Sequence, residues 1–232
     1  MIPKIIHYCW LSGDPIPEDL QAHMKSWKEK LIDYEFILWD RNRFDINQCK
    51  WVKEAYEKKK YAFAADYIRL YALYNYGGIY MDMDVEVIKS FDDMLEKDYI
   101  LGYESSYGIE AGIIGSIPKA EWLKTCLLYY DGRPFIKKNG KMDTYPLPWI
   151  LYNIITKDYT NFKILSHDYL TTKSLEDGEI RITANTHTIH HFAGSWCDWR
   201  LKLKRFLFLQ IIKSKILYTI YKMTYRKLHK RP

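Results

Sequence analysis

Two aspartates one residue apart are the clearest chemical feature of this sequence. Asp82 and Asp84 lie in the run "YGGIYMDMDVEVI", residues 76–88. If this run is a strand, both carboxylates point to the same side, because side chains alternate along a strand. They repel each other unless a positive group faces them. Oxygen ligands suit hard divalent cations, so the pair predicts a Mg²⁺ or Mn²⁺ ion that holds a diphosphate. An exposed turn with two solvated acids is the alternative.

A second pair of charged residues precedes the aspartates. Asp66 and Arg69 are three positions apart on a predicted helix and therefore share a face. They form either an intrahelical ion pair of little energetic value or a polar pair that binds a ribose hydroxyl and a phosphate. Gly77 and Gly78 are expected to end this helix. Their lack of side chains is also expected to let a phosphate-bearing ligand approach the backbone.

The segment "THTIHHFAGSWCDW", residues 186–199, forms a third polar cluster. His191 is predicted to supply a neutral imidazole to the same cation. The hydroxyl of Ser195 and the indole N–H of Trp196 can donate to phosphate oxygens. His190 and His191 alternate faces on a strand, so only one of them should face the site. A core histidine with satisfied hydrogen bonds is the alternative interpretation.

Strands and helices alternate along the chain and are expected to position these residues. Strands are predicted at 3–10, 34–39, 98–104, 108–116, 162–165 and 186–192, and within 76–88; helices are predicted at 18–31, 48–60, 62–76, 119–130 and after Pro146. This alternation predicts an α/β fold with a mainly parallel central sheet. Trp10 ends the first strand, where an α/β sheet binds ligands, so it either stacks on a nucleobase or belongs to the core.

Charge is distributed unevenly along the 232 residues, whose net charge is +6. From Arg200 onward there are eleven Lys and Arg and no Asp or Glu, which leaves 24 basic against 29 acidic residues in 1–199. An acidic body argues against nucleic-acid binding, which needs basic residues spread over the surface. The tail, 200–232, has an apolar helical stripe and is predicted to be a basic amphipathic helix on an anionic membrane surface. A helix packed on the body is the alternative. The stripe comprises Leu209, Ile212, Ile216, Ile220 and Met223.

The four cysteines lie far apart, with neither a CxxC pair nor Cys/His zinc spacing. No secretory signal and no apolar run long enough to span a membrane is seen in the sequence. We therefore expect reduced thiols and a cytoplasmic protein attached peripherally to the inner face of the plasma membrane. The expected organisation is a catalytic domain at 1–199 followed by the tail at 200–232.

Three blocks of this sequence resemble a known family. "IIHYCWLSG", "AADYIRLYALYNYGGIYMDMD" and "HHFAGSW" occur in the order found in the DxD-containing sugar-binding glycosyltransferase family. That family includes bacterial capsular polysaccharide enzymes and yeast initiating α-1,6-mannosyltransferases, and it is distantly related to the clostridial glucosylating toxins. The resemblance covers roughly residues 1–199. It implies a GT-A-type, Rossmann-like mixed sheet flanked by helices.

The resemblance also implies roles for individual residues. Asp82, Asp84 and Arg69 would be catalytic, and the metal would be held by Asp82, Asp84 and His191. Of these three ligands, His191 matches the family least well, because the toxins have an acidic residue at that position. The residues that it places at the donor are Cys9, Trp10, Asp66, Arg69, Tyr80, Asp82, Ser195 and Trp196.

The function that this resemblance implies is retaining hexosyl transfer. The sugar, of the galactose, glucose or mannose type, would pass from a nucleotide sugar, with a UDP-hexose preferred to GDP-mannose, to a glycan or polyprenyl-linked saccharide. The cofactor would be Mn²⁺ or Mg²⁺. Cell-surface polysaccharide synthesis is the expected setting. The alternatives are a non-catalytic nucleotide-sugar or glycan binder, and a metal-dependent phosphodiesterase or nuclease that uses the same Asp and His residues.

Overall fold

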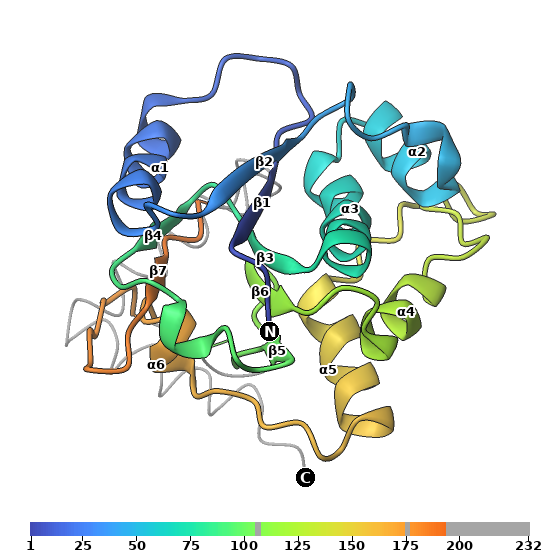
Figure 1. Cartoon of the computed structure of the whole chain (residues 1–232). Coiled ribbons are helices and arrows are strands. Elements are labelled where there is room, and N and C mark those ends of the chain that lie inside the picture. The colour runs from blue at the N-terminus through green and yellow to red at the C-terminus, as the bar shows by residue number, and fades with distance from the viewer. Residues whose placement is uncertain (105–107, 175–176, 194–232) are drawn as a thin grey trace, which may run out of the picture.

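A five-stranded sheet forms the centre of the molecule (Figure 1), in a computed structural model that describes residues 1–104, 108–174 and 177–193. The strand order is β2-β1-β3-β6-β5. β1 is parallel to β2 and β3, whereas β6 is antiparallel to β3 and β5. The α/β class is confirmed, but the sheet is evenly mixed and not mainly parallel. The strands are β1 (Ile5–Cys9), β2 (Glu35–Trp39), β3 (Gly78–Met81), β5 (Tyr99–Ile100) and β6 (Ile113–Ser116).

A separate two-stranded ribbon lies beside this sheet. It pairs β4 (Val85–Val87) antiparallel with β7 (Thr188–His190), and Val85 is opposite His190. The run 76–88 is therefore two strands in two sheets, separated by residues 82–84, and not one strand. This break places the aspartates where the chain leaves the central sheet for the ribbon.

Helices cover both faces of the central sheet (Figure 1). α1 lies on one side together with the β4–β7 ribbon, and α2 to α5 lie on the other side. The predicted helix 18–31 is confirmed almost to the residue, whereas the predicted helix 48–60 is a shorter α2 preceded by a 3₁₀ turn. The helices are α1 (Glu18–Lys30), α2 (Lys50–Glu57), α3 (Tyr61–Tyr76), α4 (Glu121–Leu128), α5 (Leu147–Asp158) and α6 (His167–Leu170), and the 3₁₀ turns are η1 (Ile46–Gln48) and η2 (Asp92–Met94).

The alternation of side chains along the strands divides the interior into two cores. Tyr80 and Ile114 belong to the core beneath α2 to α5, whereas Ile79 and Ile113 belong to the core beneath α1 and the ribbon. Successive residues thus serve opposite faces, as the period of a strand requires. Because both faces are covered, β3 and β6 are buried along their whole length. A ligand can therefore bind at the ends of the central strands but not on their faces.

The two glycines between α3 and β3 are packed tightly against neighbouring parts of the chain. Gly77 adopts φ +67° and Gly78 adopts φ +96°, both in the left-handed region that favours glycine. A Cβ on Gly78 would lie 2.6 Å from the carbonyl oxygen of Ile5, and one on Gly77 would lie 2.7 Å from Cδ of Pro118. The expectation that these glycines give a ligand room is wrong, because neighbouring chain already occupies that space.

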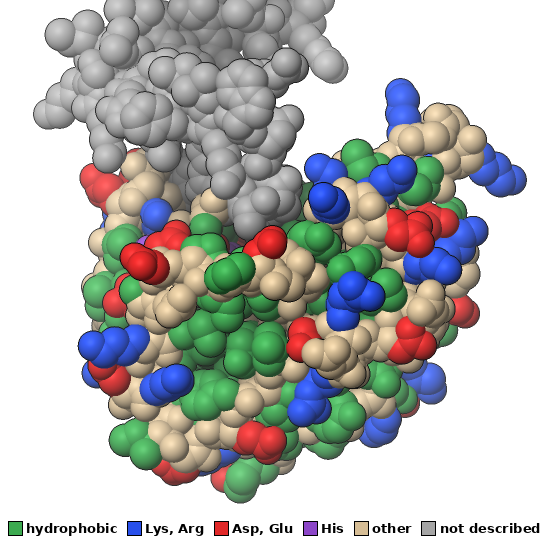
Figure 2. Space-filling view, turned by 90° about the horizontal axis from the view of Figure 1, so that it is seen from above, with side chains coloured by type: hydrophobic (Ala, Val, Ile, Leu, Met, Phe, Trp, Pro, Cys, Tyr) green, Lys and Arg blue, Asp and Glu red, His purple; other side chains and the backbone are tan. Residues whose placement is uncertain are grey.

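In the described part of the chain, no helix combines the length and apolarity needed to cross a membrane. The predicted tail, 200–232, lies outside the described residues. On the face drawn in Figure 2, basic and acidic side chains are interspersed around hydrophobic ones, without a continuous basic stripe.

Candidate active site

Asp82 and Asp84 lie in a tight turn at the carboxyl end of β3. The N–H of Val85 donates to the carbonyl of Asp82 over 3.1 Å, which closes the turn. The strand alternation that we expected does not apply here, because the chain bends between the two acids. The turn still brings both carboxylates to one place. An oxygen of each and a ring nitrogen of His190 all lie within 4.8 Å of one another.

Arg69 is the cation that faces Asp82. Its Nη1 lies 3.4 Å from Oδ2 of Asp82, and its Nη2 lies 3.2 Å from Oδ1 of Asp66. Only 4% of Arg69 is exposed, and its guanidinium also lies over the ring of Tyr80 and donates to the carbonyl of Ala111. Asp66 and Arg69 on α3 are therefore buried beside Asp82 and do not form a solvated ion pair at the surface.

Two further groups adjust the charge around Arg69. The hydroxyl of Tyr80 donates to Oδ1 of Asp82 over 2.9 Å, which holds the carboxylate from its other oxygen. Burial raises the pKa of Asp66 to about 6, although the nearby Arg69 acts in the opposite direction. Asp66, Arg69, Tyr80 and Asp82 thus form one connected network, as expected of residues that share a site.

His190 is the cation that faces Asp84. Its Nε2 lies 3.3 Å from Oδ1 of Asp84. Burial lowers the pKa of His190, but the negative charges of Glu110 and Asp84 outweigh this and raise it well above the usual value. The N–H of Ala193 donates to the second carboxylate oxygen of Asp84 over 2.7 Å.

The choice of His191 as the partner of the two aspartates is corrected by this geometry. His191 lies on the other side of the ribbon, where its Nε2 is 2.9 Å from Oε2 of Glu86. The sequence had indicated that only one of the two histidines would face the site. Which one it is depends on the pairing of β7 with β4, where His190 lies opposite Val85.

Glu110 is a site residue that the sequence analysis missed. It is 1% exposed and accepts hydrogen bonds from Thr171 Oγ1 and from the N–H of Gly112, and its Oε1 lies 3.1 Å from Nδ1 of His190. A carboxylate that holds the far nitrogen of a histidine fixes the orientation and tautomer of its ring. A charged residue within the apolar run "GIEAGIIGS" was the available signal.

Gly112 was also missed. Its lack of a side chain leaves room for the side chains of His190 and Asp82. A Cβ there would lie 2.6 Å from Cε1 of His190 and 3.0 Å from Oδ2 of Asp82. Its carbonyl accepts the N–H of Asp82 over 2.7 Å. The residue that precedes β6 therefore supports the aspartate turn directly, through a backbone hydrogen bond.

Cys9 and Trp10 reach the same edge from the neighbouring strand. β1 and β3 are parallel with His7 opposite Tyr80, so the end of β1 lies beside Asp82. Burial raises the pKa of the Cys9 thiol, which therefore stays protonated. The ring of Trp10 is half-buried, and its Nε1–H donates to the carbonyl of Asp14 over 2.7 Å. Ser195 and Trp196 lie outside the described residues.

The donor set of Asp82, Asp84 and His190 fits a divalent cation. Two carboxylates and one imidazole can each supply an atom to the same small volume, provided that His190 gives up its Nε2 proton when the ion binds. Mg²⁺ prefers oxygen ligands and retains several waters, so the imidazole favours Mn²⁺. An ion bound there would neutralise the two carboxylates and leave positions for the oxygens of a diphosphate.

Residues 17–101 match the model of the glycosyltransferase sugar-binding region containing a DXD motif. Mannosyl phosphorylinositol ceramide synthase SUR1 of Saccharomyces cerevisiae is 30% identical over 176 residues, covering 71% of this chain and 44% of that protein. Inositol phosphoceramide mannosyltransferase 3 of Schizosaccharomyces pombe is 34% identical over 118 residues, which are 49% of this chain and 33% of that protein. The initiation-specific alpha-1,6-mannosyltransferase of Candida albicans is 25% identical over 131 residues, which are 52% of this chain and 34% of that protein. The matches span less than half the length of these relatives.

Two solved structures share the fold. The PaToxG glycosyltransferase superposes with a TM-score of 0.53 at 17% identity, covering 69% of this chain and 71% of its own. The glycosyltransferase GlyE of Streptococcus pneumoniae TIGR4 superposes with a TM-score of 0.50 at 14% identity, covering 98% and 65%. The mixed sheet with helices on both faces is therefore the GT-A-type fold that the sequence resemblance implied.

Proposed function

We propose that this chain, in which residues 17–101 carry a DXD sugar-binding region, is a metal-dependent glycosyltransferase that uses a nucleotide sugar. The observation that carries the proposal is the convergence of Asp82, Asp84 and His190 at the carboxyl edge of the sheet, next to Arg69. Ligands of α/β sheets bind at this edge. The motif and a complete donor set thus coincide in one place.

The residues around the aspartates fit the charge that the reaction creates. When the bond between the sugar and the diphosphate breaks, negative charge develops on the leaving phosphate. Arg69 is held in place by two carboxylates, two backbone carbonyls and the ring of Tyr80, and it offers a fixed positive charge that stabilises such a transition state without reorganisation. A divalent ion held by Asp82, Asp84 and His190 would supply further positive charge to the diphosphate. Trp10, at the end of β1, is proposed to stack on the base, with Cys9 beside it.

Retention of the sugar's configuration is proposed to follow from a front-face displacement. The acceptor hydroxyl bonds to the anomeric carbon on the face that the diphosphate leaves, and its proton passes to the leaving phosphate oxygen. This route needs no protein nucleophile. The ion pairs of the site support this route, because a carboxylate that is paired with a basic residue is a poor nucleophile. Asp66 and Asp82 are paired with Arg69, and Asp84 and Glu110 with His190.

Mannose is the hexose that we propose first, ahead of galactose and glucose. The names of the yeast relatives, which include mannosyltransferases of inositol phosphoceramide and an initiating α-1,6-mannosyltransferase, support this order. They also favour GDP-mannose over the UDP-hexose that the sequence suggested. The proposed acceptor is a hydroxyl of a glycan or of a lipid-linked head group, and the basic tail is proposed to hold the enzyme at the inner face of an anionic membrane.

A panel of UDP- and GDP-sugars with Mn²⁺ tests this function. We expect one donor to raise the melting temperature and to be hydrolysed slowly without acceptor. Asp82→Asn and Asp84→Asn should each abolish hydrolysis, whereas Asp158→Asn, at an exposed position on α5, should leave it unchanged. Binding without turnover would identify a nucleotide-sugar binder, and the absence of both would refute the proposal.

A further inference from the structure

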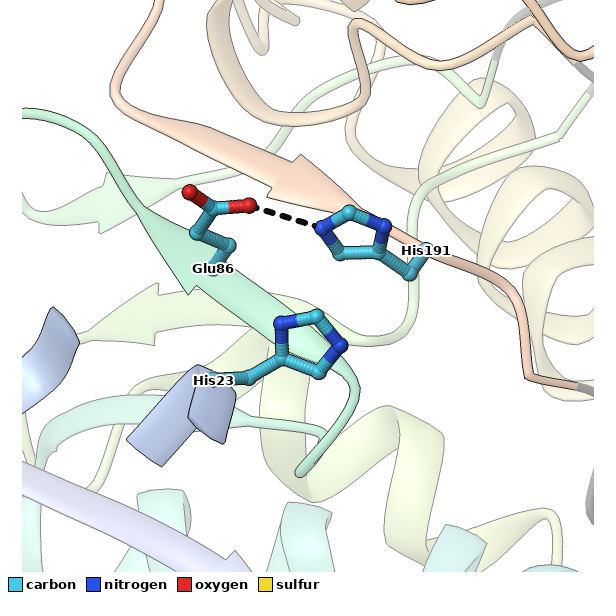
Figure 3. A group of neighbouring side chains, drawn as sticks. All are labelled: His23, Glu86 and His191. Atoms are coloured by element: carbon cyan, nitrogen blue, oxygen red, sulfur yellow. Dashed lines mark hydrogen bonds and ion pairs between the residues drawn. The ribbon is translucent and has the colours of Figure 1, made fainter. Parts of the chain in front are cut away.

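Two histidines and a glutamate converge outside the proposed active site (Figure 3). His23 comes from α1, Glu86 from β4, and His191 directly follows β7. One ligand atom from each residue lies within 4.8 Å of the other two. Nε2 of His191 is 2.9 Å from Oε2 of Glu86, and the two imidazole rings stack with centroids 4.2 Å apart.

This cluster shares no side chain with the group formed by Asp82, Asp84 and His190. The two groups are separated by the ribbon, because His190 and His191 are consecutive and face opposite sides. A backbone hydrogen bond joins them, in which the N–H of His191 donates to the carbonyl of Asp84 over 2.9 Å, and the charge of Asp84 also acts on His23. The cluster therefore needs an explanation of its own.

We propose that His23, Glu86 and His191 form a binding site for a transition-metal cation of the Zn²⁺ class. Two imidazoles and one carboxylate are a common protein ligand set for zinc, with water in the fourth position of a tetrahedral shell. Imidazole-rich sites favour Zn²⁺, Ni²⁺ or Cu²⁺, whereas the aspartate-rich site suits Mn²⁺. The chain would thus hold two different ions on the two sides of one ribbon.

The surroundings of His23 support this assignment. Among the described residues, neither ring nitrogen of His23 has a hydrogen-bond partner, so a lone pair is available to a metal. Burial and the neighbouring imidazole of His191 lower the pKa of His23, which favours the neutral ring that a metal needs, and Glu86 supplies the negative charge of the cluster. The side chains of His191 and Glu86 are 23% and 38% exposed, so an ion can enter from solvent and keep a bound water.

An ion at this position would act as a cross-link between elements. It would tie α1 to both strands of the ribbon, which carries His190 and follows the aspartate turn. The loop that holds the donor set would then open less readily, since opening would require loss of a metal–ligand bond. The proposed role of this site is structural support for the active site and not participation in the reaction.

Titration of the full chain with Zn²⁺, and the visible absorption spectrum of its Co²⁺ form, test the proposal without any need for activity. We expect one tight site with the spectrum of a tetrahedral ion. His23→Ala and Glu86→Gln should each weaken binding by about 100-fold, because a site with few ligands divides its binding free energy among them. His167→Ala, which removes an exposed histidine from α6, is the matched control and should bind as the wild type.

The double variant Asp82→Asn with Asp84→Asn separates this site from the proposed active site. It should keep the tight Zn²⁺ site although it loses donor hydrolysis. If the double variant loses tight binding and His23→Ala keeps it, the ion belongs to the aspartates and the proposal is overturned. Equal binding by His23→Ala, Glu86→Gln and wild type would overturn it as well. Circular dichroism of each variant establishes that it is folded.

Discussion

Each of the two aspartates is faced by a cation that a different element supplies. Arg69 from α3 faces Asp82, and His190 from β7 faces Asp84. The repulsion expected of two neighbouring carboxylates is therefore already compensated within the protein. The carboxylates are also close enough to share a divalent ion, which would take the place of the proton between His190 and Asp84.

Glu110 acts on this geometry through His190 and is a positioning residue. Glu110→Gln keeps the shape of the side chain but removes the charge that holds Nδ1 of His190. Because loss of such a partner weakens metal sites about 10- to 100-fold, we expect the Mn²⁺ concentration for half-maximal donor hydrolysis to rise by that factor. The maximal rate at saturating Mn²⁺ should remain close to that of the wild type.

The matched control is Glu121→Gln on α4, where the side chain is 75% exposed. It should leave the Mn²⁺ dependence unchanged. A variant at Glu110 with unchanged Mn²⁺ dependence would remove His190 from the metal site. A fall in the maximal rate alone would indicate a role in the chemical step and not in metal binding.

At the scale of elements, the connection from α3 to β3 fixes where the aspartate turn begins. Gly78→Ala would place a Cβ 2.6 Å from the carbonyl oxygen of Ile5 in a backbone conformation that side chains rarely adopt. Strain and overpacking together should lower the free energy of unfolding by roughly 2–5 kcal/mol. Gly140→Ala, which has positive φ but open space, should cost only about 1–3 kcal/mol.

Urea unfolding of both glycine variants measures this difference. The affinity of folded Gly78→Ala for the donor should equal that of the wild type, because Gly78 lies at the opposite end of β3 from Asp82. A weakened donor affinity with unchanged stability would restore the earlier expectation that these glycines make room for a ligand.

His7 connects β1 to two neighbouring elements in its neutral form. The Nε1–H of Trp39 donates to Nδ1 of His7, so Nε2 carries the proton that is donated to the carbonyl of Gly77. Burial lowers the pKa of His7 from 6.5 to about 4. The unfolded chain takes up a proton below 6.5 while the folded chain does not, so stability from His7 is full above this pH and is lost as the pH falls toward 4.

The comparison of wild type with His7→Gln isolates this effect. The difference between their free energies of unfolding should shrink by about 2 kcal/mol from pH 7.5 to pH 5, because one unit of pKa corresponds to about 1.4 kcal/mol. Urea unfolding at several pH values measures it. A difference that does not vary with pH would mean that His7 accepts a proton equally well in both states.

At the scale of the whole molecule, charge is separated along the chain. Residues 1–199 carry more acidic than basic residues, and the face in Figure 2 shows both signs intermixed. The prediction that no nucleic acid is bound rests on the composition of residues 1–199, and it stays a prediction. The excess positive charge belongs to residues 200–232.

Membrane attachment through residues 200–232 is tested by flotation with vesicles. The full chain should float with anionic vesicles but not with neutral ones, because each basic residue near an anionic surface contributes about 1 kcal/mol. A chain shortened to residues 1–199 should stay in the dense fraction, and added salt should reduce recovery of the full chain. Equal recovery of the two chains would contradict the prediction.

The sequence by itself determined the two long helices before β3 and the identity of the acid pair. Periodicity placed α1 and α3 almost to the residue, because amphipathic spacing is a local property of the chain. The spacing of Asp66 and Arg69 indicated a shared helix face for the same reason. The three blocks that resemble the glycosyltransferase family also supplied the fold type, which the superpositions on two glycosyltransferase structures bear out.

Only the tertiary structure decided which residues complete the site. Glu110 and His190 are 80 positions apart, and Glu86 and His191 are 105 apart, so no local pattern relates them. The choice between His190 and His191 depends on the register of β7 against β4, since a shift of one residue exchanges the two faces of a strand. The role of Gly112 likewise depends on which strands become neighbours, and long-range packing fixes that after local structure has formed.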